Sequence, residues 1–322
     1  MKFVHMTGRP LEYIFNPNLR DICQIIVLFN QSISWVLFCL LVFFAIKKSA
    51  KLGNFRWYLL NRSVWCILFE TGMTLFKPIP LPPAFGIFCD GVFRQHGPLV
   101  SLTQGGFCVI CAHNALMGVT ISLVHRYFIF PNKWQIFFRS KWIIIIYFLE
   151  HVGLASVVVG CLVWYGTVDS AEIRKTALEV DETLSYFFDE PSFVVVNPDT
   201  VKPYLILGLM GIYGVVLFAV VIGFFFVRRL RFLNMKENSF HSFKITKMLF
   251  VSNVVQFIVT VIYLIFPFTV FFLLHIFDLP YSGQMVMVAL TFCSFHCTLE
   301  FITSIYFVSP YKAYIKKCWA EE

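Results

Sequence analysis

The fold is decided by long apolar stretches such as residues 142–165, which read WIIIIYFLEHVGLASVVVGCLVWY. This stretch contains Glu150 and His151 but is otherwise apolar, and it exceeds the roughly 20 residues that an α-helix needs to cross a bilayer. It lacks the alternation of polar and apolar residues that a membrane β-strand has. Six further stretches have the same character, although the second contains Arg62 and Glu70. The seven expected spans are residues 22–46, 57–76, 98–125, 142–165, 204–227, 248–275 and 283–308.

The composition also indicates a membrane protein. Of the 322 residues, 58% are hydrophobic and only 14% are charged, whereas soluble proteins carry roughly 25% charged residues. The 39 Phe residues exceed what one soluble core of this size can hold, and a disordered chain would be poor in aromatics. We therefore expect one all-α membrane domain, residues 1–322, that forms a seven-transmembrane helix bundle.

Lys and Arg residues are unevenly distributed among the connections between the spans. Most of the 26 basic residues fall in the first, third and fifth connections and in the tail, residues 309–322, when Arg56 and Arg62 are counted with the first connection. The outer loop, residues 166–202, is acidic instead. Basic connections remain in the cytoplasm, so we expect the N-terminus outside and the C-terminus inside. The net charge of +8 then reflects topology and contact with anionic membrane lipid, and it requires no nucleic acid.

Most of the ten cysteines lie within the spans, where a thiol is usually a small buried hydrophobe. The loop of residues 166–202 contains no Cys, so it cannot form a disulfide with the third span. Cys89 could pair with Cys23 or Cys161, and the spacing does not choose between them. Cys318 follows two lysines in the tail and is a candidate for palmitoylation.

Two outer connections have distinctive compositions. Residues 77–83 contain four prolines, which exclude a helix and favour a stiff, extended segment. The loop of residues 166–202 is long, acidic and aromatic. It could cover the outer mouth of the bundle as a lid or form a solvated linker.

Several ionisable side chains fall inside the expected spans, where their cost makes each a candidate for function. They are Glu70, His113, Glu150, His296 and Glu300. Each could contact a ligand, bind an ion or relay a proton, and the alternative for each is a hydrogen bond that fixes helix packing. His296 and Glu300 are four residues apart and therefore share a helix face.

The sixth span contains Pro267. A proline inside a helix removes a backbone hydrogen bond and bends the helix, so we expect a kink there that could serve as a hinge.

The sequence gives little support for catalysis. It contains no His-Glu-x-x-His motif, no Gly-x-Ser-x-Gly motif and no phosphate-binding loop, and His296 with Glu300 supplies too few ligands for a metal. We therefore expect neither an enzyme nor a bound metal or cofactor. An ion channel or proton-coupled transporter that uses Glu70, Glu150 and Glu300 is an alternative, although seven spans do not divide into inverted repeats. A structural partner without a ligand is a third interpretation.

The cytoplasmic end of the third span contains Arg126 between His125 and Tyr127, which resembles the Asp-Arg-Tyr element of G-protein-coupled receptors with His in place of the acid. A closer similarity is to the nematode serpentine chemoreceptors of the H and I classes. It extends from the second span to the tail. The motifs that carry it are Pro78-Ile79-Pro80-Leu81-Pro82 followed by Gly86 and Gly91, then His125-Arg126-Tyr127, His296 and Ser309-Pro310-Tyr311-Lys312, where Lys312 replaces the usual Arg.

This resemblance implies a receptor for a small-molecule cue at the plasma membrane of a sensory neuron, in its cilia. The ligand would bind among the outer halves of the third, fifth, sixth and seventh spans and shift a two-state equilibrium of the helices, with Pro267 as the hinge. A heterotrimeric G protein would bind at the cytoplasmic face, and a receptor oligomer is left open. The coupling residues would be His125, Arg126, Tyr127, Arg228, Arg229 and Arg231.

Overall fold

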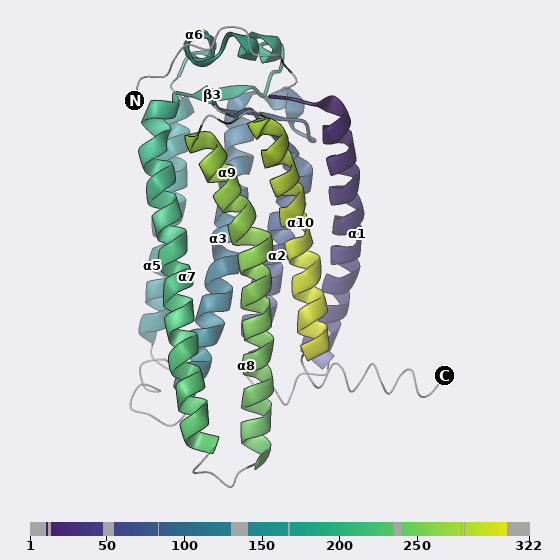
Figure 1. Ribbon diagram of the computed structural model, residues 1–322, viewed down its shortest axis with the longest axis vertical. Helices are drawn as coiled ribbons and strands as arrows, with labels where there is room; N and C mark the ends of the chain where they lie inside the picture. The colour runs from purple at the N-terminus through teal and green to yellow at the C-terminus, as the bar shows by residue number, and fades with distance from the viewer. Residues whose placement is uncertain are drawn as a thin grey trace, which may run out of the picture.

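The computed structural model describes residues 11, 14–47, 55–82, 84–129, 141–166, 168–234, 240–277, 279 and 281–307. Within these residues, seven long helical segments lie side by side as a bundle (Figure 1). They are α1 (Pro17–Lys47), α2 (Phe55–Phe76), α3 (Pro98–Ile129), α5 (Lys141–Gly166), α7 (Pro198–Asn234), the continuous segment α8 (Phe240–Thr260), η5 (Val261–Ile265) and α9 (Phe266–Ile276), and α10 (Ser282–Phe307).

Six of these segments are long and apolar enough to span a membrane by length and composition. The exception is α2, which carries Arg62 and Glu70. Both side chains are buried inside the bundle, with exposed fractions of 2% and 1%. Because their polar groups face neighbouring helices and not lipid, α2 packs within the bundle despite its lower apolar content. Arg62 lies roughly two turns inside α2, so counting it with the first connection was wrong.

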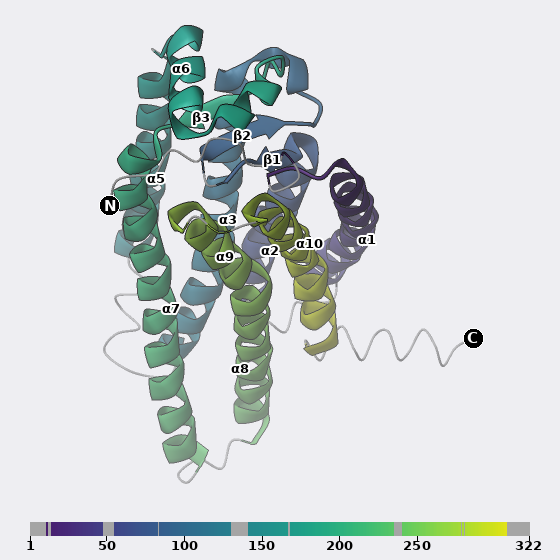
Figure 2. The ribbon, with the colours of Figure 1, turned by 45° about the horizontal axis from the view of Figure 1, so that its top comes forward.

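A three-stranded antiparallel sheet covers one end of the bundle (Figure 2). Its strands are β1 (Pro78–Pro80), β2 (Phe85–Cys89) and β3 (Val194–Val196), with β2 in the middle. Together with η3 (Arg94–His96), α6 (Ser170–Val180) and η4 (Glu182–Phe187), the sheet forms a folded layer that we call the cap. The prolines of β1 occupy an edge strand, where a missing N–H group costs little.

The cap has its own hydrophobic core. Ile79 and Phe88 of the sheet pack with Ile173 of α6 and with Leu184 and Phe187 of η4, and all five are buried. The loop of residues 166–202 is therefore a folded lid on the bundle and not a solvated linker.

Two cap glycines are required by close packing. A Cβ atom on Gly91 would lie 1.8 Å from the carbonyl oxygen of Leu75, at the end of α2. A Cβ atom on Gly86 would lie 2.8 Å from Val195 Cγ2, on the neighbouring strand β3. Side chains at these positions would push the sheet away from the bundle.

Neither of the disulfides considered for Cys89, with Cys23 or with Cys161, joins the cap to the bundle. Cys89, Cys23 and Cys161 are all free thiols, and burial raises the pKa of the Cys89 thiol. Arg94 links the loop after β2 to the segment before β3 instead. Its Nε donates to Glu190 Oε2 at 2.8 Å and its Nη2 donates to Glu190 Oε1 at 2.5 Å, while its Nη1 donates to Asp90 Oδ1 at 3.1 Å. Bidentate contacts of this kind fix orientation as well as distance.

A π-helical turn, η5, lies directly before Pro267, the residue at which the sequence predicts a kink. The N–H group of Phe266 donates to the carbonyl oxygen of Val261, five residues earlier. Because proline has no N–H group to donate, the wider turn lets the chain continue from α8 into α9 as one segment.

Candidate functional site

A cavity of about 270 Å³ lies directly beneath β2 and β3 of the cap, among the adjacent ends of α2, α3, α9 and α10. We call it the cap-side cavity. Its walls are mostly apolar, and its lining includes Phe76, Ile87, Leu102, Phe268, Phe271 and Leu290. A mostly apolar enclosure with a few polar groups is typical of small-molecule sites.

The absence of side chains at two α3 residues shapes this cavity. A Cβ atom on Gly106 would lie 2.5 Å from Val158 Cγ1, so this glycine allows α5 to approach α3. A Cβ atom on Gly105 would meet only the ring of Phe76, at 3.7 Å, so this glycine leaves space in the cavity itself.

His275 of α9 supplies one polar group to the cavity. Its Nδ1 lies 2.7 Å from the carbonyl oxygen of Phe271, to which it donates because a carbonyl can only accept. In the neutral ring the other nitrogen, Nε2, is then a hydrogen-bond acceptor. Among the described residues no partner bonds to Nε2, so a ligand hydroxyl could donate to it.

Ser101 of α3 supplies a second polar group. Its hydroxyl is buried and has no hydrogen-bond partner among the described residues. Most buried hydroxyls are paired, because an unpaired one costs roughly 1–3 kcal/mol. A ligand with one hydrogen-bonding group would satisfy it.

The space between α3, α5 and α7 shares Phe85, Leu102 and Gly106 with the cap-side cavity. This second space has a volume of about 680 Å³, and Tyr204 of α7 on its wall is exposed on the outside of the bundle. The two spaces are therefore neighbours on either side of these shared residues.

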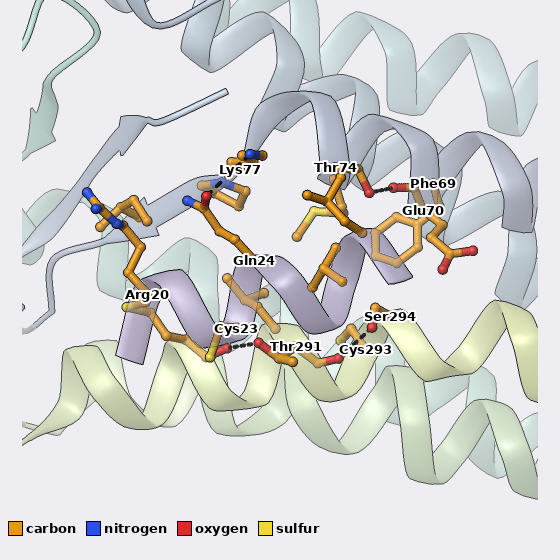
Figure 3. Close-up of a pocket in the computed structure, with 17 residues that line it drawn as sticks. Arg20, Cys23, Gln24, Phe69, Glu70, Thr74, Lys77, Thr291, Cys293 and Ser294 are labelled. Atoms are coloured by element: carbon orange, nitrogen blue, oxygen red, sulfur yellow. Dashed lines mark hydrogen bonds between the residues drawn. The ribbon is translucent and has the colours of Figure 1, made fainter. Parts of the chain in front are cut away.

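A smaller cavity of about 60 Å³ lies between α1, α2 and α10 (Figure 3). Lys77 donates to Gln24 Oε1 at 3.3 Å on one side of it, while Glu70 and Ser294 lie on the other. Its volume corresponds to roughly two water molecules at about 30 Å³ each. This space is too small for a molecule of more than a few atoms.

A buried ion pair connects three helices in the interior. Arg62 of α2 donates through Nη2 to the carboxylate of Glu300 on α10, and the two side chains are 2% and 0% exposed. Arg62 Nη1 donates to Gln256 Oε1 of α8 at 2.8 Å, and Gln256 in turn donates to Ser304 Oγ at 2.7 Å. Gln256 therefore links α8, which continues into α9, to the Arg62–Glu300 ion pair.

A second polar cluster connects α1, α2 and α10. Asn30 of α1 donates to Glu70 Oε1 at 3.1 Å, and Thr298 of α10 donates to Asn30 Oδ1 at 2.9 Å. Ser34 and Thr298 share a hydrogen bond of 2.6 Å. Each of these side chains is buried, so together they specify how the three helices pack.

The histidines and acids expected from the sequence fall into separate groups. Glu150 of α5 is paired with His113 of α3 and with the adjacent His151, at the edge of the bundle. His296 Nε2 lies 3.3 Å from Thr260 Oγ1 in the interior. Glu70, Glu150 and Glu300 have different hydrogen-bond or ion-pair partners: Asn30, His113 with His151, and Arg62.

None of the five ionisable residues chosen from the sequence lines the cap-side cavity. Of the spans expected to surround a ligand, α3, α9 and α10 line this cavity with α2 and the sheet, and α7 contributes no lining residue to it. His275 and Ser101 were missed: His275 ends its span and Ser101 is an ordinary helical serine, so no pattern distinguishes either. In the described part of the chain, no cluster of three or more His, Cys, Asp or Glu residues could hold a metal ion.

The residues expected to contact a G protein lie at the end opposite the cap. His125, Arg126 and Tyr127 belong to the last turns of α3, and their side chains are outside the described part of the structure. Arg228 and Arg231 are exposed on α7, and the side chain of Arg229 is not described. Cys318 and the Ser309–Lys312 motif also lie outside the described residues.

A comparison with curated proteins finds no match. A comparison with protein-family models matches residues 16–321 to the family described as "Serpentine type 7TM GPCR chemoreceptor Srh". This match covers all seven helices and the cap, and it confirms the resemblance to the nematode serpentine chemoreceptors. The chain belongs to the Srh family of serpentine seven-transmembrane G-protein-coupled chemoreceptors.

Proposed function

We propose that this chemoreceptor binds a small, mostly apolar molecule in the cap-side cavity and signals to a heterotrimeric G protein at the opposite end. The observation that carries the proposal is the cavity itself, which is closed by the cap and lined by α9, the segment that follows the π-helical turn. Its volume of about 270 Å³ equals that of roughly nine water molecules, which suits a molecule of roughly nine non-hydrogen atoms.

The polar groups of the cavity favour a ligand that carries a hydroxyl. His275 Nε2 can accept a hydrogen bond and Ser101 Oγ can donate or accept one, whereas the remaining walls are mostly apolar. An alkyl alcohol satisfies these requirements.

Binding would be transmitted along the sixth span. A ligand that contacts Phe268, Phe271 and His275 changes the preferred position of α9, and η5 with Pro267 joins α9 to α8. Gln256 on α8 accepts a hydrogen bond from Arg62, so a movement of α8 would stretch or break the bond that joins α8 to the buried ion pair. Ligand binding would then favour one of two helix arrangements, as in any population shift.

The signalling end would be cytoplasmic, with the cap and the N-terminus outside the cell. Arg126 at the end of α3, together with Arg229 in the basic end of α7, would contact the G protein. The receptor would act at the plasma membrane of a sensory neuron, in its cilia, where the cap meets external molecules.

The His275→Phe substitution is expected to remove the preference for alcohols. With octanol and its isomer methyl heptyl ether as probes, the wild-type receptor should bind the alcohol about fivefold more tightly, which is the value of roughly one net hydrogen bond. A phenyl ring at this position would keep an aromatic shape but could not accept a hydrogen bond. Ligand-induced thermal stabilisation in nanodiscs measures both affinities. The His96→Phe variant, altered in the cap outside the cavity, is the control, and an alcohol preference that survives in His275→Phe would contradict this assignment.

Replacing Arg126 with Ala is expected to abolish ligand-stimulated nucleotide exchange on the G protein while leaving ligand binding intact. The reason is that its position at the end of α3 is far from the cavity. Exchange is measured with an octanol-type ligand that activates wild type, at matched surface expression, with Arg174→Ala in the cap as the control. Unimpaired exchange in Arg126→Ala would reject the coupling role and leave the cavity assignment standing.

A further inference from the structure

A groove of about 700 Å³ lies between α7 and α8 near the end opposite the cap, with Leu123 of α3 on its wall. In both ribbon views α7 and α8 run side by side toward that end (Figures 1 and 2). Their lining side chains include Phe224 and Val220, which are 64% and 51% exposed on the outside of the bundle. A Cβ atom on Gly223 would meet nothing within 4 Å, so the groove is open at that residue.

Two arginines lie at one end of this apolar groove. Arg228 and Arg231 of α7 line it, both are exposed, and neither forms a salt bridge with any acid of the described residues. They are three residues apart, which places them on the same face of α7. Two adjacent guanidinium groups are suited to a phosphate group, which they can bind by paired hydrogen bonds.

The length of the groove matches one leaflet of a bilayer. Its α7 wall extends from Ala219 to Arg231, which is roughly 18 Å of helix at about 1.5 Å per residue. Half of a hydrocarbon core about 30 Å thick is roughly 15 Å. An acyl chain along the groove would therefore end where the arginines meet the headgroup layer.

We propose that the groove between α7 and α8 is a binding site for an anionic phospholipid of the cytoplasmic leaflet. One acyl chain lies against Phe224, Val254 and Phe257, and the phosphate bonds to Arg228 and Arg231. Anionic lipids are concentrated in the cytoplasmic leaflet, which is the side given to this end in the proposed topology. A lipid in this groove contacts both α7 and α8, so it would influence their separation independently of any ligand in the cap-side cavity.

The test uses the full-length receptor in nanodiscs with fluorescent phosphatidylserine or phosphatidylcholine, each labelled on one acyl chain. Both lipids carry a phosphate, but the choline cation of phosphatidylcholine neutralises its charge, whereas phosphatidylserine remains anionic. Wild type is therefore expected to prefer phosphatidylserine by roughly tenfold or more, because each basic residue near the surface contributes on the order of 1 kcal/mol of attraction to an anionic lipid. The Arg228→Gln/Arg231→Gln variant should lose this preference. The Arg174→Gln/Lys175→Gln variant removes the same charge from α6 in the cap and should keep it.

A second variant tests the acyl-chain part of the site. Gly223→Phe fills the groove and should weaken the binding of both lipids, whereas Gly214→Phe, at another open glycine of α7 outside the groove, should not. Thermal unfolding without added lipid shows that each variant is folded. Equal binding of the two lipids to wild type would overturn the proposal. Displacement of labelled phosphatidylserine by water-soluble glycerophosphate at equal concentration would also overturn it, since that result indicates a phosphate site without a lipid chain.

Discussion

The Arg62→Ala receptor is expected to be largely lost from the cell surface. Arg62 and Glu300 are almost completely buried, and removing one partner leaves the other charge without compensation. Breaking a buried pair in this way costs about 3–5 kcal/mol, compared with about 5–15 kcal/mol for the stability of a whole protein. The loss is measured by surface staining and by thermal unfolding of the receptor in detergent. The amount of folded receptor should fall by more than roughly tenfold.

A paired substitution separates the charge from the packing. The Arg62→Met/Glu300→Leu receptor removes both charges and keeps most of the side-chain volume, and it should recover much of the surface level, because apolar replacements of buried ion pairs are often neutral or stabilising. Lys175→Ala is the control, since Lys175 is highly exposed and its contact with Glu179 at 3.9 Å contributes little. Normal surface levels of Arg62→Ala, or a double variant worse than either single one, would be incompatible with a buried ion pair.

The Gly105→Leu receptor is expected to reach the surface but to respond poorly to any ligand of the cap-side cavity. The added side chain would occupy part of the roughly 270 Å³, while its Cβ atom has only an ordinary contact with Phe76. The dose–response curve should shift to ligand concentrations about 100-fold higher or more. The reason is that the ligand must displace or share space with a packed leucine, at a cost of about 3 kcal/mol. Octanol-stimulated nucleotide exchange at matched surface expression provides the measurement.

The matched control for this prediction is Gly214→Leu. Gly214 lies on the exposed face of α7, and a Cβ atom there meets nothing within 4 Å. This variant carries the same substitution at a position in contact with lipid and should respond as wild type does. If Gly105→Leu also responds normally, the ligand binds outside the cap-side cavity, and the space between α3, α5 and α7 becomes the next candidate.

The helices themselves could be predicted from the chain because lipid imposes a strict condition on each of them. In hydrocarbon every backbone polar group must be bonded within its own segment, so a long apolar run has to be a helix. Each expected span is helical, as residues 142–165 within α5 illustrate. The extended segment around Pro78 followed in the same local way from the geometry of proline.

Polar residues inside the helices were harder to interpret. Hydropathy identified Glu70 and Glu300 as unusual, but it could not identify Arg62 as the partner of Glu300, 238 residues away in the chain. Hydropathy even assigned Arg62 to the first connection, because a charged residue near the start of a span normally marks the boundary between the connection and the span. The packing of α2 against α3, α8 and α10 makes that position a buried one, with Gly118 of α3 lying directly against the Arg62 side chain.

The local physics of the chain was sufficient for the seven helices, their order and the extended proline segment, while the chemoreceptor family was indicated by the resemblance of short motifs. The tertiary structure was needed for the cap, in which Cys89 meets Ser192, 103 residues away, and for the cavity beneath it. The physical reason is that helix formation in lipid depends on neighbouring residues, whereas a cavity depends on surfaces that meet only after folding. Ser101, Gly105 and His275 line one cavity because α3, α9 and the sheet enclose the same space.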